Sequence, residues 1–226
     1  MLILAVDTSG RHGSVALCRP DATNFEVLGL NSLEGGTYSA RLIPAIGDLL
    51  QHAGLRKAQI DGFVVVDGPG SFTGLRVGLS SVKALCEILQ KPLATMSMLE
   101  ALAITYGKEG ETVTAVLDAG RGEVYGGEYQ VSGESAVVIQ QYIQKLEVFV
   151  ERADSMQLRI LTTFPALAGA LAASSASVIV VDALPADAMA RIGFRKLLAG
   201  ETADPATLDA NYIRRSDAEL FSLPKP

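Results

Sequence analysis

Two aspartates, Asp7 and Asp118, are the residues of this chain best suited to chemistry. Each follows an apolar run, in AVDTSGRHG and VLDAGRGEV, and each opens a short turn that also carries an arginine. A carboxylate beside the backbone N–H groups of a tight turn can position a divalent metal and an anionic ligand. An aspartate in such a place also commonly caps its own turn. The sequence leaves two interpretations of each aspartate open. It is a weak candidate for binding a cofactor, or it caps its own turn.

The segment DGPGSFTGLR, residues 67–76, is the second candidate. An apolar strand runs into this turn, and a helix is expected to begin near Ser71. A helix N-terminus preceded by glycines can bind an anion. No lysine follows the second glycine as a GxxxxGK[ST] nucleotide loop requires, so the sequence favours tight packing and protein contact over a phosphate site.

The glycines within that helix bear on what packs against it. Gly74 and Gly78 lie one turn apart, and Ser81 follows on the same face. Each glycine costs about 1 kcal/mol relative to alanine inside a helix. A face without side chains lets another backbone approach, and Phe72 beside it would be an exposed aromatic unless a partner covered it. The pattern predicts that another molecule packs against this helix.

The composition narrows the classes of function. The chain has 226 residues, of which 49% are hydrophobic, and a formal net charge of -6. Independent nucleic-acid binding normally shows as a basic excess, so direct binding of tRNA by this chain alone is not expected. His12 and His52 form no HxxxH or HExxH pair, and Cys18 and Cys86 lie in apolar surroundings as buried thiols do. A short apolar start without a basic leader, and no apolar run of about 20 residues, predict a cytoplasmic protein without membrane contact.

Hydrophobic patterning predicts two successive α/β segments, each opening with three strands. The first is expected to comprise strands at 2–6, 14–18 and 25–30, a helix at 37–53, a strand at 60–66, a helix at 71–90, a strand near 93 and a helix at 97–106. The second is expected to comprise strands at 112–117, 123–130 and 136–140, a helix at 142–152, strands at 158–161 and 178–181, and a helix ending near Gly200.

The repeated opening indicates a duplicated unit. Three antiparallel strands followed by helix-linked parallel strands form a ribonuclease-H-like module, and two such modules give the α/β architecture of actin, sugar kinases and Hsp70-type ATPases. We expect an N-terminal lobe at 1–108 and a C-terminal lobe at 109–226. The second lobe is expected to end in an irregular tail that carries a basic pair, Arg214–Arg215.

Five segments together resemble the bacterial TsaB (YeaZ) family. They are ILAVDTSG with SVAL, SARLIPAIGDLL, DGFVVVDGPGSFTGLRVGLSSVKAL, LDAGRGEVY and NYIRRSDAEL, in this order along nearly the whole chain. The most specific is GPGSFTGLR, residues 68–76. Two positions depart from the family pattern, because Tyr38 stands where a histidine is usual and Gly120 is inserted into an Asp-Ala-Arg motif.

The resemblance implies a two-lobed, actin-like ASKHA fold and an accessory function. Proteins of this family are non-catalytic partners of the TsaD subunit, which with the ATPase TsaE places a threonylcarbamoyl group on adenosine 37 of tRNA (t6A). The helices matching 38–53 and 71–90 form a bundle with TsaD, or a homodimer when TsaD is absent. TsaD holds its metal through an HxxxH pair, which this chain lacks.

The sequence thus predicts a non-catalytic scaffold without a cofactor or metal of its own, which meets tRNA only through the complex. Its expected partner surface consists of residues from the two helices, namely Leu42, Ile46, Leu49, Phe72, Gly74, Leu75 and Gly78. The alternative is a small ASKHA-fold ATPase or kinase that uses Asp7 and Asp118.

Overall fold

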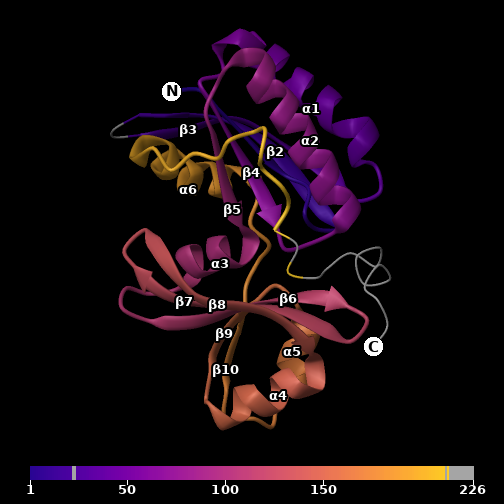
Figure 1. Ribbon diagram of the computed structural model, residues 1–226, viewed down its shortest axis with the longest axis vertical. Helices are drawn as coiled ribbons and strands as arrows, with labels where there is room; N and C mark the ends of the chain where they lie inside the picture. The colour runs from indigo at the N-terminus through magenta and orange to yellow at the C-terminus, as the bar shows by residue number, and fades with distance from the viewer. Residues whose placement is uncertain (22–23, 212, 214–226) are drawn as a thin grey trace. The chain divides into compact units, whose positions relative to one another are not determined.

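The structure, a computed structural model, describes residues 1–21, 24–211 and 213 (Figure 1). The basic pair Arg214–Arg215 and nearly all of the tail that we expect to be irregular lie outside these residues. The described chain divides into two compact units. The first comprises Met1–Ala101 and Leu184–Ala210, and the second comprises Leu102–Ala183 with the described residues after Ala210.

The sheet of the first unit contains five strands in the order β3-β2-β1-β4-β5. Their bounds are β1 Ile3–Asp7, β2 His12–Pro20, β3 Phe25–Glu34, β4 Gly62–Gly68 and β5 Leu93–Ser97. The first three are antiparallel, whereas β4 and β5 run parallel to β1. Every residue of β1 is buried, as is typical of a central strand covered on both faces.

Three helices of the first unit cover its sheet from two sides. Helices α1 (Tyr38–His52) and α2 (Phe72–Leu89) lie side by side on one face, and α6 (Ala186–Ala199) lies on the other (Figure 1). Helix α2 begins where the Ser71 hydroxyl accepts a hydrogen bond from the Gly74 N–H, 3.3 Å away, and ends at Gln90, which has a left-handed backbone. Helix α3 (Met98–Tyr106) follows β5.

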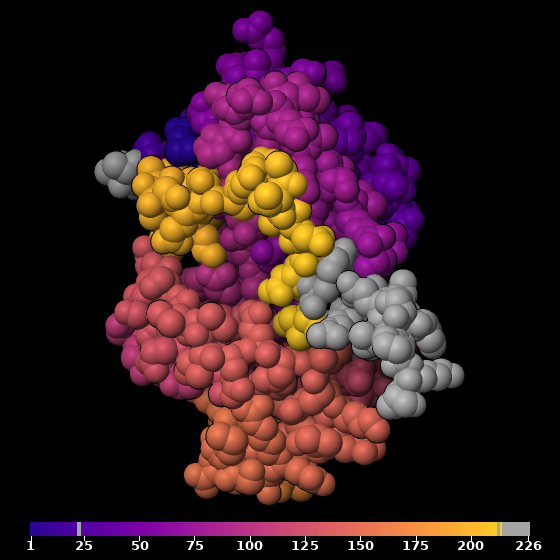
Figure 2. Space-filling view, in the orientation of Figure 1, coloured from indigo at the N-terminus to yellow at the C-terminus, as the bar shows by residue number. Residues whose placement is uncertain are grey.

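Helix α6 belongs to the first unit, although the sequence placed it in the second lobe. The Ala186 N–H donates a 2.8 Å hydrogen bond to Ser14 Oγ on β2. Gly193 lies so close to β4 that a Cβ there would be 2.3 Å from Val64. A glycine at this crossing lets the helix lie against the sheet, and this packing returns residues 184–210 to the first unit. The segment after α6 lies on the surface of that unit (yellow in Figure 2).

The second unit repeats the topology of the first. Its strand order is β10-β9-β6-β7-β8, with β6, β7 and β8 antiparallel and β9 and β10 parallel to β6. The strands are β6 Thr112–Gly120, β7 Glu123–Ser132, β8 Ser135–Lys145, β9 Arg159–Thr162 and β10 Ser177–Val180. Val116, Phe149 and Ile160 are among its fully buried core residues. The repeated order confirms the prediction of two ribonuclease-H-like units.

One boundary in the second unit differs from the sequence-based expectation. The sequence predicts a helix from Tyr142, but β8 continues to Lys145, and helix α4 covers Leu146–Ser155. The reason is the long hairpin with β7, whose pairing extends to Glu123 opposite Lys145. Helix α5 (Pro165–Ala170) then connects β9 to β10. The apolar spacing of 142–152 fits a helix locally, but residues 142–145 form a strand because they pair with β7.

Candidate functional site

The turn after β1 is organised around Asp7. Its side chain is only 3% exposed, and Oδ1 accepts hydrogen bonds from the Ser9 N–H at 2.8 Å and from Ser9 Oγ at 2.7 Å. Burial raises the pKa of the Asp7 carboxyl, and the two bonds from Ser9 oppose that rise. The contacts are those of an aspartate that caps its own turn.

Helix α2 lies directly on this turn. Cβ atoms added to Gly74 and Gly78 would lie 2.1 Å from the Thr8 carbonyl oxygen and 2.2 Å from Thr8 Oγ1. Thr8 Oγ1 donates a 2.8 Å hydrogen bond to the Gly74 carbonyl, and the Ser71 N–H donates one of 2.6 Å to the Ser9 carbonyl. The glycines of α2 therefore make room for the chain's own first turn.

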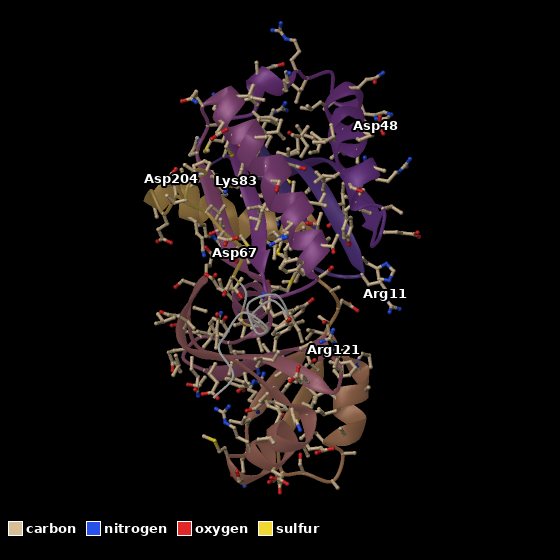
Figure 3. The ribbon with its side chains drawn as sticks, turned by 45° about the vertical axis from the view of Figure 1, so that its right-hand side comes forward. Arg11, Asp48, Asp67, Lys83, Arg121 and Asp204 are labelled. Carbon is tan, nitrogen blue, oxygen red and sulfur yellow. The ribbon has the colours of Figure 1, made fainter. Side chains whose placement is uncertain are left out.

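Asp118 has the same role at the end of β6 in the second unit. Its Oδ1 accepts a 2.8 Å hydrogen bond from the N–H two residues on, at Gly120, as Asp7 does from Ser9. The tip is a tight turn in which Gly120, Arg121 and Gly122 all have positive φ. Arg121 and its counterpart Arg11 are both exposed, each at the turn of its own unit (Figure 3). The duplicated feature is a capped turn at the end of the first strand of each unit.

Six of the seven residues expected at a partner surface are instead buried within the first unit. The side chains of Leu42 and Leu75 are 1% exposed, and those of Ile46 and Leu49 are 5% exposed. Gly74 and Gly78 are buried against Thr8. Phe72 alone of the seven is exposed, at 40%. Helical spacing correctly grouped these residues on one face of each helix, but that face points into the unit.

The outward faces of the same two helices carry several apolar and small residues, beside exposed charged residues such as Arg41, Asp48 and Glu87. We call these apolar and small residues, together with Arg76, the α1–α2 face. It consists of the exposed residues Ser39, Ala40, Ile43, Pro44, Gly47, Phe72, Thr73, Arg76, Ser80 and Ala84. Ile43 is 53% exposed, and the Arg76 guanidinium stacks 3.9 Å from the centre of the Phe72 ring. Sequence reasoning missed Ile43, although it follows Leu42 directly and breaks the apolar spacing of the buried face.

The other reactive side chains are dispersed or shielded. Cys18 and Cys86 are free and buried, and burial raises the pKa of each thiol to about 12, so both stay protonated at neutral pH. Among the described residues, no three His, Cys, Asp or Glu side chains are grouped so that they could hold a metal ion. Within the same residues, no helix has the length and apolarity needed to cross a bilayer.

Comparison with known proteins identifies relatives of the chain. Residues 35–166 match the family model TsaD, described as tRNA N6-adenosine threonylcarbamoyltransferase. The "tRNA threonylcarbamoyladenosine biosynthesis protein TsaB" of Bacillus subtilis is 35% identical over 130 residues, covering 58% of this chain and 56% of that protein. The Escherichia coli protein of the same name is 35% identical over 132 residues, covering 58% and 55%. The aligned part of this chain thus spans about half the length of these curated relatives.

The similarity to solved structures extends over more of the chain than the similarity to the curated relatives. YeaZ from Pseudomonas aeruginosa superposes with a TM-score of 0.74 at 25% identity, covering 93% of this chain and 99% of that one. A protein described as similar to the peptidase YeaZ from Pseudomonas aeruginosa gives 0.76 at 26% identity, covering 94% and 99%. Because the family model covers more than half of the chain, and the curated relatives and the fold agree with it, the chain belongs to that family and, within it, to the TsaB (YeaZ) proteins.

Proposed function

We propose that this chain is a non-catalytic scaffold subunit that supports a TsaD-type subunit in the threonylcarbamoylation of adenosine 37 in tRNA. The observation that carries the proposal is the exposed α1–α2 face in a chain whose curated relatives are named as t6A biosynthesis proteins. The TsaD-type subunit docks on this face, and a TsaE-type ATPase completes the complex. A second copy of the chain uses the same face when the larger subunit is absent.

The chemistry of the α1–α2 face suits a protein partner. Aromatic and arginine side chains dominate the energy of protein interfaces, and Phe72 and Arg76 form such a pair at the exposed start of α2. Ala40, Gly47 and Ala84 have short side chains or none, so a partner helix can approach closely. Apolar burial contributes about 25 cal/mol per Å² before the costs of association.

The contacts of Asp7 support a role without catalysis. The Asp7 carboxylate is buried and engaged by Ser9, and α2 covers the turn that a phosphate would have to approach. Asp118 is exposed and its Oδ1 is bonded to its own turn at Gly120, so the support comes from Asp7. Metal and phosphate binding need carboxylate oxygens and turn N–H groups that are free to face a ligand.

Co-purification with the TsaD-type subunit of the source cell, followed by mass spectrometry of t6A in its tRNA, tests the proposal. Cells depleted of this chain are expected to lose t6A, and the wild-type chain is expected to restore it. Retention of the TsaD-type subunit is expected only when the α1–α2 face is intact. Normal t6A in depleted cells, or a chain that hydrolyses Mg-ATP by itself, would contradict the scaffold function.

Phe72→Ala is expected to weaken binding of the TsaD-type subunit about 5- to 30-fold, because it removes an exposed aromatic anchor and the surface on which Arg76 stacks. The unfolding transition is expected to stay near that of the wild type, since Phe72 is 40% exposed. Titration calorimetry with purified subunits measures the affinity. Leu198→Ala, which truncates a 66% exposed side chain on α6, is the matched control and should bind as the wild type does. Equal affinities for both variants would place the interface elsewhere.

A further inference from the structure

Ten residues after α6, Glu201–Ala210, form a segment that we call the strap. Gly200 ends α6 with φ 75°, a left-handed conformation that turns the chain out of the helix. In the middle of the strap, Asp204 Oδ1 accepts a 2.9 Å hydrogen bond from the Ala206 N–H, which fixes a local turn. Most strap residues are exposed, so the segment runs along the surface of the first unit (Figure 2).

Hydrogen bonds attach the strap to a strand and to a helix of the unit. The Ala203 N–H donates a 2.8 Å hydrogen bond to the Leu93 carbonyl, in a single antiparallel bridge to the edge strand β5. Lys83 Nζ on α2 donates a 2.6 Å hydrogen bond to the Leu208 carbonyl. The strap therefore shields part of the β5 edge and ends beside α2.

The position of Lys83 places the strap beside the α1–α2 face. Gly74, on the same helix, lies next to α1, since a Cβ there would be 3.3 Å from the Tyr38 ring. Lys83 follows Gly74 by nine residues, which at about 3.6 residues per turn puts the two on opposite sides of α2. The exposed ridge of α2, with Thr73, Ser80 and Ala84, lies between those sides. Thus α1 borders the ridge on one side and the strap borders it on the other (Lys83 and Asp204 are labelled in Figure 3).

The strap has the features of a segment that opens easily. Its attachments to β5 and α2 are an isolated bridge and one bond from a long lysine side chain, and six of its ten residues are exposed, although Ala210 at its end is buried. Exposed backbone segments with few buried contacts open at a small fraction of the free energy of global unfolding. A protein that covers the closed strap would stabilise it, and by linkage a looser strap would weaken that protein's binding.

We propose that the strap is the third segment of the partner surface, and that the protein docking on the α1–α2 face also covers the strap and slows its opening. This inference rests on the proposed function and names a further part of its site. Glu201, Asp204 and Asp209 give the strap an acidic surface. The complementary partner therefore has an apolar centre over the α2 ridge and a basic rim over the strap.

Hydrogen exchange on the full chain, free and bound to the TsaD-type subunit, tests the proposal. In the complex, amide exchange in the strap is expected to slow about tenfold or more. Lys83→Met keeps most of the side-chain volume but removes the bond to Leu208, so strap exchange in the free variant should speed up about tenfold. Its affinity for the subunit should fall by the same factor as the closed fraction of the free strap, which the exchange data give, with exchange in β1 unchanged. Lys57→Met, an exposed lysine in a separate 3₁₀ turn, is the control and should match the wild type.

The outcomes separate the two claims. If the complex forms but strap exchange stays at its free rate, the strap is not part of the surface, and the scaffold function stands. An affinity of Lys83→Met that does not follow the measured loss of closed strap overturns the coupling in the same way. If the wild-type chain does not bind the subunit at all, the proposed function fails, and this inference fails with it.

Discussion

Gly74→Ala is expected to lower the free energy of unfolding of the first unit by about 2–4 kcal/mol. The added Cβ would lie 2.1 Å from the Thr8 carbonyl oxygen, a backbone atom that cannot rotate away. Relief requires α2 to move off the β1 turn, which would also break the bond from Thr8 Oγ1 to the Gly74 carbonyl. The higher helix propensity of alanine offsets only about 1 kcal/mol of this loss of stability. Urea unfolding followed by circular dichroism measures the loss.

The matched control for this substitution is Gly47→Ala in α1. Gly47 is also a helix-interior glycine, but a Cβ there meets nothing within 4 Å. Alanine at this exposed position should raise stability by up to about 1 kcal/mol. If Gly74→Ala unfolds like the wild type but no longer binds the TsaD-type subunit, Gly74 is part of the partner surface and not a packing residue. A Cβ added at Gly78 would lie 2.2 Å from Thr8 Oγ1, so a bulky residue there should destabilise the first unit whether or not it affects binding.

Asp67→Asn is expected to raise the free energy of unfolding by about 2 kcal/mol at pH 8. Asp67 is the last but one residue of β4. Burial raises the pKa of its carboxyl to about 6 from 3.8, while a hydrogen bond from the Thr95 side chain lowers it, nearby Glu100 raises it and Lys196 lowers it. Within the described residues, Oδ1 of Asp67 is buried without a hydrogen-bond partner. Such a shift corresponds to about 3 kcal/mol, which partial exposure to solvent reduces to about 2.

The sign of the pH dependence follows from the raised pKa. The folded protein holds the Asp67 proton more tightly than the unfolded chain does, so this group contributes most to stability below about pH 4. That contribution is lost as pH rises through about 6, because the ionised carboxylate stays buried. Asparagine does not ionise. The advantage of the variant should therefore be full at pH 8 and disappear near pH 4.

Urea unfolding at several pH values between 4 and 8 measures this difference. Asp48→Asn, which changes a solvent-exposed carboxylate on α1, is the control and should differ little from the wild type at every pH. If the curves of wild type and Asp67→Asn run parallel across this range, the buried carboxylate is not the source of the pH dependence. A loss of stability at pH 8 would show that the contact with Thr95 outweighs the cost of the buried charge.

Much of the architecture could be predicted from the sequence because it depends on local chemistry. The continuous apolar runs of β1 and β4 are typical of central strands, and the turns at Asp7 and Asp118 have residues that cap themselves. The two halves have the same order of elements, and the topology of each sheet followed from that order. The specific segment at 68–76 also identified the family to which the chain belongs.

Three features were decided only by tertiary structure. Helix α6 returned to the first sheet because Gly193 meets Val64, and β8 extended to Lys145 because β7 offered a partner strand. The glycine face of α2 turned inward onto Thr8. The amino-acid sequence determined which residues share a face, since that depends on the period of a helix or strand. It did not determine what covers the face, because a buried surface has the same apolar and small residues whether its neighbour is the same chain or another molecule.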